Sequence, residues 1–390
     1  MKNKLNFYYI AMQFIYYVSC VCLCGYGSYI LISIGYDSAK VGLLISAACI
    51  LSVLISPIIA NLSDKNEKYN IFVIGNIITW IALVLCIISF FQNKVSLFTS
   101  LSFVLLRITT SIAEPFINAI PSKLEQCGVD IKFGIGRSMG SFSYAIFSTI
   151  IGFLTEVYPY QVVYVLNIAS YILAIVLYFF LTKNYNSIPK IKNNSEEEKT
   201  ISYLDFIKRH KMFLVVCITI IGVYLGYVMV DNLMVLIINN VNGTESEMGL
   251  ILGIKALLEI PVIFFYDKIE AKIPNNVLLK IAAIGLAIKA LIVCLARSTV
   301  LLYVAQIVQP FSLALMVPAF VSFINKIMDK KEAVRGQSMF TMMMIISTII
   351  ASSVGGKIAA DYSVSTMLLF AFIVNVISSV IFCFLIDKCK

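Results

Sequence analysis

The sequence predicts an all-α membrane protein, with twelve transmembrane helices arranged in two six-helix bundles. Composition, twelve apolar runs and one charged central segment predict this fold class. Hydrophobic residues make up 60% of the 390 positions and charged residues only 13%, which is roughly half the charged share of a soluble domain. So few charged side chains leave too little polar surface to cover a water-facing globule, which excludes an ordinary soluble protein.

The apolar runs fall into two groups of six. A helix that crosses a bilayer needs ~20 mostly apolar residues. Runs of that kind predict spans in the first half at 6–33, 41–60, 70–92, 96–120, 134–155 and 160–182. The second half has them at 212–238, 245–265, 275–296, 299–326, 334–356 and 363–386. We therefore expect an N-terminal bundle over 1–182 and a C-terminal bundle over 212–390.

The segment 183–211 between the two groups is the most polar part of the chain, and we expect it to be a cytoplasmic linker. If the amino terminus is cytoplasmic, 21 Lys and Arg fall in inside segments and four in outside loops. Basic residues favour the cytoplasmic side of a membrane. The asymmetry predicts a multi-pass protein of the inner (cytoplasmic) membrane with both termini in the cytoplasm, and it accounts for the net charge of +9 without a nucleic-acid partner.

Cysteine and histidine usage predicts neither a metal site nor a disulfide framework. Cys20, Cys22 and Cys24 alternate within the first span, and residues two apart on a helix do not share a face. The one histidine, His210, lies in the polar linker, where we expect it to be solvated. The sequence has no phosphate-binding Gly-x-x-x-x-Gly-Lys-Ser/Thr motif. We therefore expect no metal and no cofactor.

The second predicted span and the loop after it resemble the lactose permease group of the major facilitator superfamily. In that superfamily the loop reads roughly Gly-x-Leu-x-Asp-Arg, and here it reads Ala60-Asn61-Leu62-Ser63-Asp64-Lys65. The resemblance implies the major facilitator fold, and it implies that Asp64 and Lys65 form a conformational switch loop.

The start of the fifth span carries a sharper resemblance. It reads Phe133-Gly134-Ile135-Gly136-Arg137-Ser138-Met139-Gly140-Ser141, which is similar to the Tyr/Phe-Gly-x-x-Arg-x-x-Gly-Ser/Cys pattern of the oligosaccharide:proton symporter group. That group includes relatives for nucleosides and for phenylpropionate-like acids. The resemblance implies that Arg137 and Tyr144, seven residues apart on one helix face, bind substrate.

The resemblance extends into the second half of the chain. Tyr227 and Asp231 match the seventh helix of lactose permease, and Glu259-Ile260-Pro261 matches the eighth. Lys289 falls where that permease carries an arginine in its proton-coupling cluster. The resemblance therefore adds Tyr227 to the expected substrate site and places Asp231, Glu259 and Lys289 at the expected proton site.

Three departures from the family pattern change the expected chemistry. Asn118 stands in place of the sugar-binding carboxylate, and Gln309 and Ser312 stand in place of the proton-coupling His and Glu. A lactose-like substrate and the usual proton carrier are therefore not expected. We expect Asn118 and Gln309 to contact substrate instead, and another acid to carry the proton.

Charged residues inside the spans are the candidates for that role, because each costs at least ~2.5–3.5 kcal/mol at the bilayer centre. The acids are Glu114, Asp231 and Glu259, and Glu259 is the first choice. Lys255, four residues before Glu259, and Lys289 are expected to modulate it. The alternative is that Lys255 and Glu259 form a purely structural ion pair.

Together these features favour a secondary active transporter. It would move a sugar, a nucleoside or an aromatic or other organic acid by proton-coupled alternating access, with a small-molecule substrate, protons and the lipid bilayer as partners of a monomer. The alternatives are a drug:proton efflux antiporter and a non-transporting receptor on the same fold. We do not expect an enzyme, because the spans contain no His and no acid pair at catalytic spacing.

Overall fold

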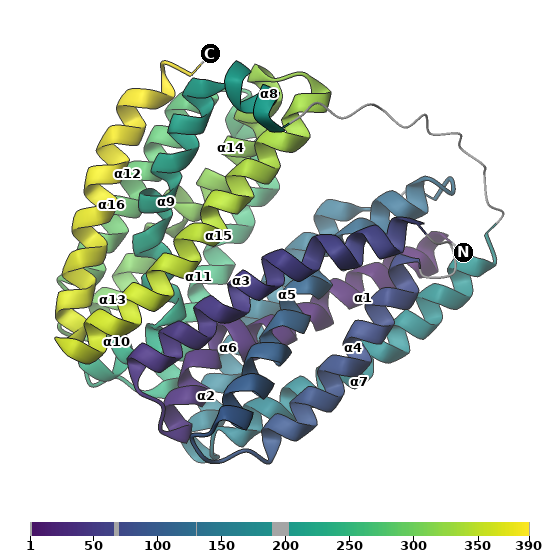
Figure 1. Cartoon of the computed structure of the whole chain (residues 1–390), viewed down its shortest axis with the longest axis horizontal. Helices are drawn as coiled ribbons and strands as arrows, with labels where there is room; N and C mark the ends of the chain where they lie inside the picture. The colour runs from purple at the N-terminus through teal and green to yellow at the C-terminus, as the bar shows by residue number, and fades with distance from the viewer. Residues whose placement is uncertain (1, 66–69, 130, 189–202, 390) are drawn as a thin grey trace. The chain divides into compact units, whose positions relative to one another are not determined.

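The computed structural model describes residues 2–65, 70–129, 131–188 and 203–389 (Figure 1). Every regular element in these ranges is a helix. Twelve of the helices in this part of the chain are long and apolar enough to cross a membrane. The predicted fold class is thus confirmed, and each predicted span overlaps one of the twelve.

Nine of the described spans are single helices, and the other three are interrupted. The single helices are α3 (Ser38–Lys65), α4 (Ile71–Phe90), α5 (Leu97–Glu125), α6 (Phe133–Val157), α7 (Gln161–Asn186), α11 (Glu245–Glu270), α12 (Asn275–Cys294), α15 (Lys330–Asp361) and α16 (Val364–Ile386). The interrupted spans are α1 (Lys2–Cys20) with η1 (Val21–Gly25) and α2 (Gly27–Ile34); α9 (Lys211–Asn232) with α10 (Met234–Asn240); and α13 (Thr299–Ile307) with η3 (Gln309–Phe311) and α14 (Leu313–Ile327). A short helix, α8 (Tyr203–Arg209), precedes α9.

Polar side chains begin several helices by capping free backbone N–H groups. The Asn70 side chain accepts from the backbone N–H groups of Phe72 and Val73 at the start of α4. The hydroxyl of Ser96 caps α5, and the hydroxyl of Ser363 caps α16. Asn70, Ser96 and Ser363 are also the first residues of three predicted spans, so the caps and the predicted span boundaries agree.

The chain forms two compact units. The first takes its described residues from Met1–Asp37, Leu44–Ser195 and Glu245–Ala256, and the second from Ser38–Leu43, Glu196–Thr244 and Leu257–Lys390. The predicted bundle boundaries at 182 and 212 stay predictions.

The helices of the first unit pack in a regular order (Figure 1). Helix α1 packs against α6 and α7, and α4 packs against α5 and α7. Large aromatic side chains, among them Tyr9, Phe72 and Tyr178, fill the core between them. Apolar residues thus face inward on helices whose other faces are also apolar, as a bilayer requires.

The second unit repeats this order with its own helices. Helix α9 packs against α15 and α16, and α12 packs against α14 and α16. In both units the first span contacts the fifth and sixth, and the third contacts the fourth and sixth. Matching arrangements of this kind are typical of transporters built from internal repeats.

Candidate substrate and proton site

The polar centre of the second unit is built on the interruption of its fourth span. Helix α13 ends at Ile307, η3 holds Gln309 and Pro310, and α14 begins at Leu313. Proline has no backbone N–H and cannot continue the helical ladder. In the membrane, such a break is tolerated where the freed backbone is buried in protein. The break places two polar side chains, Gln306 and Gln309, inside the unit, at 1% and 0% exposure.

Helix α12 approaches this break very closely, because it carries a glycine there. A Cβ added at Gly285 would lie 2.0 Å from the carbonyl oxygen of Phe311, so a side chain at position 285 would force the two segments apart. Lys289 follows one turn later on the same helix face. The glycine therefore brings the Lys289 ammonium within reach of the break.

Lys289 is 5% exposed and donates to both glutamines. Its Nζ lies 2.9 Å from Gln306 Oε1 and also contacts Gln309 Oε1. The ammonium lies 5.2 Å from the centroid of the Tyr227 ring, within the range of a cation–π interaction. A buried ammonium inside the second unit is thus held by neutral side chains from two other spans.

Glu259 joins the same network through Gln309. The Nε2 of Gln309 donates to Glu259 Oε1 at 2.6 Å. Glu259 lies on α11 two residues before Pro261, which is inside that helix. The structure therefore brings together three residues predicted from separate helices, Glu259, Lys289 and Gln309, in one hydrogen-bonded chain.

The end of α9 completes this site. The rings of Tyr224 and Tyr227 are stacked, with centroids 5.7 Å apart and an angle of 21° between planes. Asp231 and Glu259 both lie within electrostatic range of the Tyr227 hydroxyl. Tyr227, predicted as a substrate contact, therefore stands beside the predicted proton-coupling residues, and Tyr224 is a neighbour that we did not predict.

In the first unit, the glycines of the predicted motif have a packing role. A Cβ at Gly136 would lie 2.4 Å from the Tyr9 ring, and one at Gly140 would lie 2.5 Å from the Tyr17 ring. These contacts let α1 lie against α6. Between the two glycines, the guanidinium carbon of Arg137 lies 4.8 Å from the centroid of the Tyr17 ring.

Two further predicted residues, Asn118 and Glu114 on α5, lie near residues of α1. The fully buried Gln13 donates to Asn118 Oδ1 at 2.9 Å and to the Tyr9 hydroxyl at 3.0 Å. Cys20 lies within electrostatic range of both Glu114 and Arg137. The sequence did not lead us to predict Gln13 or Tyr17. Gln13 is a single polar residue inside an apolar run, and that is the one signal that could have indicated this part of the site.

Tyr144 and Lys255 meet in the first unit. The Lys255 ammonium lies 5.7 Å from the centroid of the Tyr144 ring, and Lys255 is 7% exposed. A residue predicted to bind substrate and one predicted to modulate the proton site are therefore neighbours. Asp64 and Lys65 end α3, but their side chains lie outside the described part of the structure, so their role stays a prediction.

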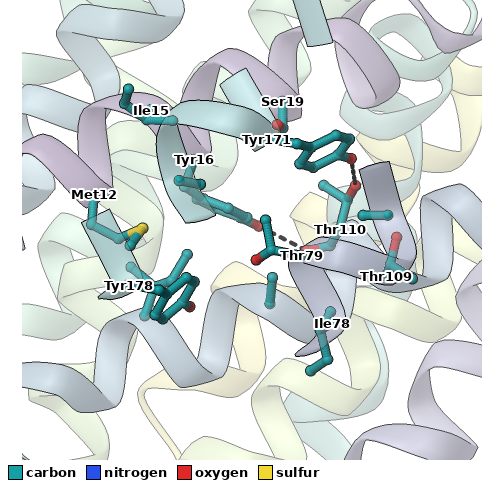
Figure 2. A pocket seen from close by; sticks show the side chains of 14 residues that line it. Met12, Ile15, Tyr16, Ser19, Ile78, Thr79, Thr109, Thr110, Tyr171 and Tyr178 are labelled. Carbon is teal, nitrogen blue, oxygen red and sulfur yellow. Dashed lines mark hydrogen bonds between the residues drawn. The ribbon is translucent and has the colours of Figure 1, made fainter. Parts of the chain in front are cut away.

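A separate small cavity lies inside the first unit, among α1, α4, α5 and α7 (Figure 2). The Tyr16 hydroxyl donates to the Thr110 carbonyl at 3.2 Å, and the hydroxyls of Thr110 and Tyr171 lie 3.2 Å apart. The free volume is about 20 Å³, enough for about one water molecule. An organic solute does not fit there.

The prediction for His210 was wrong. Its Nε2 lies 2.9 Å from Glu332 Oε2, and its ring packs against Phe206 in α8. Arg209 contacts the same carboxylate at 3.3 Å. The histidine is tied to the start of α15, because the end of the linker folds as α8 against the second unit. Within the described residues, no group of three or more His, Cys, Asp or Glu could hold a metal ion.

A family model described as "MFS_1 like family" matches residues 7–372. The chain belongs to the MFS_1 like family. Among solved structures, a mutant of the nucleoside transporter NupG superposes with a TM-score of 0.78 at 15% identity, covering 98% of this chain and 99% of that one. A bacterial homolog of the human lysosomal transporter Spinster, inward-facing and unoccupied, superposes with a TM-score of 0.77 at 12% identity, covering 100% and 97%.

No curated protein matches the sequence. At these identities the structural likeness shows the fold alone, and function must be argued from the site. The family, the fold and the twelve spans make this MFS_1 like protein a multi-pass membrane protein of the major facilitator transporter type. That conclusion confirms the predicted superfamily.

Proposed function

We propose that this protein moves a small organic solute across the cytoplasmic membrane by proton-coupled alternating access. The observation that carries the proposal is the chain Lys289–Gln309–Glu259 inside the second unit. Buried charges at membrane depth are costly and mark ion or substrate pathways. A carboxylate held in such surroundings can take and release a proton in response to nearby charge.

The aromatic surroundings support an organic solute. The stacked rings of Tyr224 and Tyr227 present a flat apolar wall beside the Lys289 ammonium. In the first unit, Arg137 offers a planar donor fork and Tyr144 a second ring. Asn118 on α5 adds a neutral hydrogen-bonding group that accepts from Gln13. The nucleoside transporter among the similar folds supports nucleosides as one candidate class, alongside sugars and aromatic or organic acids.

A drug:proton antiporter is the second candidate function. It is favoured only by the large apolar share of the chain. The buried cations Lys255 and Lys289 disfavour it for cationic drugs, because like charges repel strongly at low dielectric. We also propose that the protein acts as a monomer and is not an enzyme.

Topology follows from the basic residues. We propose that both termini and the 183–211 segment lie in the cytoplasm. Reporter fusions at Asn193 and Lys390 should both give a cytoplasmic signal. A periplasmic signal from either fusion would contradict the proposed orientation.

An uptake assay in membrane vesicles tests the function itself. Vesicles with the wild-type protein would be given a panel of labelled sugars, nucleosides and aromatic acids, with and without an imposed pH gradient. We expect at least one solute to accumulate above its outside concentration only when the gradient is present. Movement that merely equalises concentrations would show an uncoupled carrier, and no movement of any solute would favour the receptor alternative.

A further inference from the structure

The Gln309 side chain links the buried Lys289 to the half-buried Glu259 inside the second unit. Its Oε1 accepts from the Lys289 ammonium, and its Nε2 donates to Glu259 at 2.6 Å. Chemistry determines this orientation, because an ammonium only donates and a carboxylate only accepts. Both charges therefore orient the same amide dipole. A change in the charge of one partner alters the hydrogen bond that the amide makes with the other partner.

We propose that Gln309 is a positioning residue that couples Glu259 to Lys289, so that a proton on Glu259 and an anionic group of the solute at Lys289 favour each other. This inference rests on the function proposed above and names the substrate class of that site as an organic anion. The solute and the proton would then enter the low-dielectric site as an uncharged pair.

The physical reason lies in the strength of the Gln309–Glu259 hydrogen bond. Such a bond to an ionised carboxylate is roughly twice as strong as one between neutral groups. While Glu259 is ionised, it accepts from the Gln309 amide and keeps the amide oxygen directed toward Lys289. The negative charge of Glu259 then offsets the positive charge of the ammonium. When Glu259 takes a proton, this hold weakens and the positive charge of Lys289 is no longer offset. An anion then gains the full attraction of the ammonium.

Gln306 provides an internal contrast. It also accepts from Lys289, at 2.9 Å, but its Nε2 donates to the Leu302 carbonyl of its own helix at 2.9 Å. Gln306 thus holds the cation through an amide whose other end is fixed to backbone. A substitution at Gln306 disturbs Lys289 to a similar degree while leaving the link to Glu259 in place.

Other titratable groups lie on the same helix as Glu259 or interact with Tyr227 as it does, and their titration must be separated from that of Glu259. Lys255 lies one turn earlier on α11, and Tyr224, Tyr227 and Asp231 come from α9. Asp231 is the other acid within electrostatic range of Tyr227. Any titration assigned to Glu259 therefore requires Asp231→Asn beside Glu259→Gln.

The test follows the protonation of Glu259 directly, with the proton itself as the ligand. Purified full-length protein in lipid nanodiscs would be titrated with pH while the carboxylic-acid band is followed by infrared spectroscopy. The band that disappears in Glu259→Gln and persists in Asp231→Asn reports Glu259. Gln309→Met and Lys289→Met should each move its midpoint to higher pH by about one to two pH units, because each removes a group that favours the carboxylate.

The double variant decides how the two charges communicate. If Gln309 transmits the effect, Gln309→Met with Lys289→Met should shift the midpoint no further than the larger single change. Gln306→Met should shift it much less than Gln309→Met. Strictly additive shifts would show that Lys289 acts through space and would overturn the proposal, as would the absence of any band that depends on Glu259.

A matched pair of solutes tests the preference for an anion. Benzoate should raise the midpoint of the Glu259 band in the wild type, whereas uncharged benzamide should not. The benzoate effect should vanish in Lys289→Met and shrink in Gln309→Met. An unchanged midpoint with benzoate would overturn the assignment of an anion to Lys289.

Two features of the design keep the outcomes separate. If Gln309→Met does not elute as a folded protein, Gln309→Asn replaces it. Its shorter amide does not span both charges, so it should raise the midpoint of the Glu259 band in the same way. The titration needs no transport. Failure here with intact gradient-driven uptake would remove the role of Gln309 alone, whereas a successful titration without any uptake would remove the proposed transport function alone.

Discussion

Two buried cations, one in each unit, are held in different ways. Arg107 in α5 is 5% exposed, and its Nη1 donates to the backbone carbonyl of Leu23 at 2.5 Å. Leu23 lies in the π-helical segment η1, where the usual ladder of the first span is interrupted. Lys289 in α12 is equally buried, but its ammonium is held by the side-chain amides of Gln306 and Gln309.

The difference favours a structural role for Arg107 and a functional role for Lys289. A backbone carbonyl cannot leave its place without unfolding part of the helix, so Arg107 closes the gap that η1 opens in the first span. A side-chain amide can rotate and change partners at little cost. We therefore propose that Lys289 changes its partners during a transport cycle and that Arg107 keeps its partner.

The largest expected effect tests the close approach that positions Lys289. Gly285→Ala should lower the stability of the protein by about 3 kcal/mol, because the added methyl group meets the Phe311 carbonyl at 2.0 Å. Thermal melting in detergent measures the change. Gly134→Ala is the matched control, since a Cβ there meets nothing within 4 Å, and it should change stability by at most about 0.5 kcal/mol. Equal melting temperatures for both variants would contradict this account of the break.

The next largest effect is expected when the buried cation Arg107 is removed. Arg107→Met should cost about 1–3 kcal/mol, because it leaves the buried Leu23 carbonyl without its donor. Among variants that still fold, the pH dependence of uptake should match the wild type. The same melting experiment, followed by uptake at several pH values, checks both parts. A shifted pH profile with unchanged stability would mean that Arg107 belongs to the proton site instead.

A smaller effect concerns the cation of the predicted motif. Tyr17→Leu should remove the cation–π contact with Arg137 and cost about 0.5–2 kcal/mol in stability or solute binding. Tyr17→Phe keeps the ring and serves as the control, with little loss expected. If Tyr17→Leu and Tyr17→Phe behave alike in melting and in solute-binding titrations, the ring does not hold Arg137.

The smallest effect concerns a cation at the edge of the second unit. Lys280 pairs with Asp387, and this contact, with that of Asn276, lowers the pKa of the Asp387 carboxyl. Because the folded pKa lies below the unfolded one, the pair stabilises the protein above the usual pKa of aspartate. The contribution is lost as pH falls through the lowered value. Asp387→Asn should therefore melt slightly below the wild type at neutral pH and together with it in strong acid; a difference that grows in acid would reverse the sign.

The sequence was sufficient for the fold because hydropathy is decisive in a membrane chain. All twelve predicted spans overlap described helices. The interruption at Gln309–Phe311 was not predicted, although the missing N–H of Pro310 accounts for it. The interruption at η1 was not predicted, because Val21–Gly25 contains no proline and reads as an ordinary apolar run.

The candidate site was predictable in its members but not in its connections. Glu259 and Lys289 were indicated as charged residues in spans and by the family resemblance, and Gln309 was indicated by the resemblance. Their link depends on distances between α11, α12 and η3, which one sequence does not contain. His210 shows the same limit, because its partner Glu332 is 122 positions away and meets it only through the fold of α8.

The central claim is that Glu259 carries the proton in the network that holds Lys289. Proteoliposomes with wild-type protein and with Glu259→Gln, loaded with a solute identified by the uptake panel, test it most directly. We expect Glu259→Gln to abolish accumulation driven by a pH gradient while exchange of labelled for unlabelled solute continues, because exchange needs no net proton movement. Normal gradient-driven accumulation by Glu259→Gln would contradict the claim.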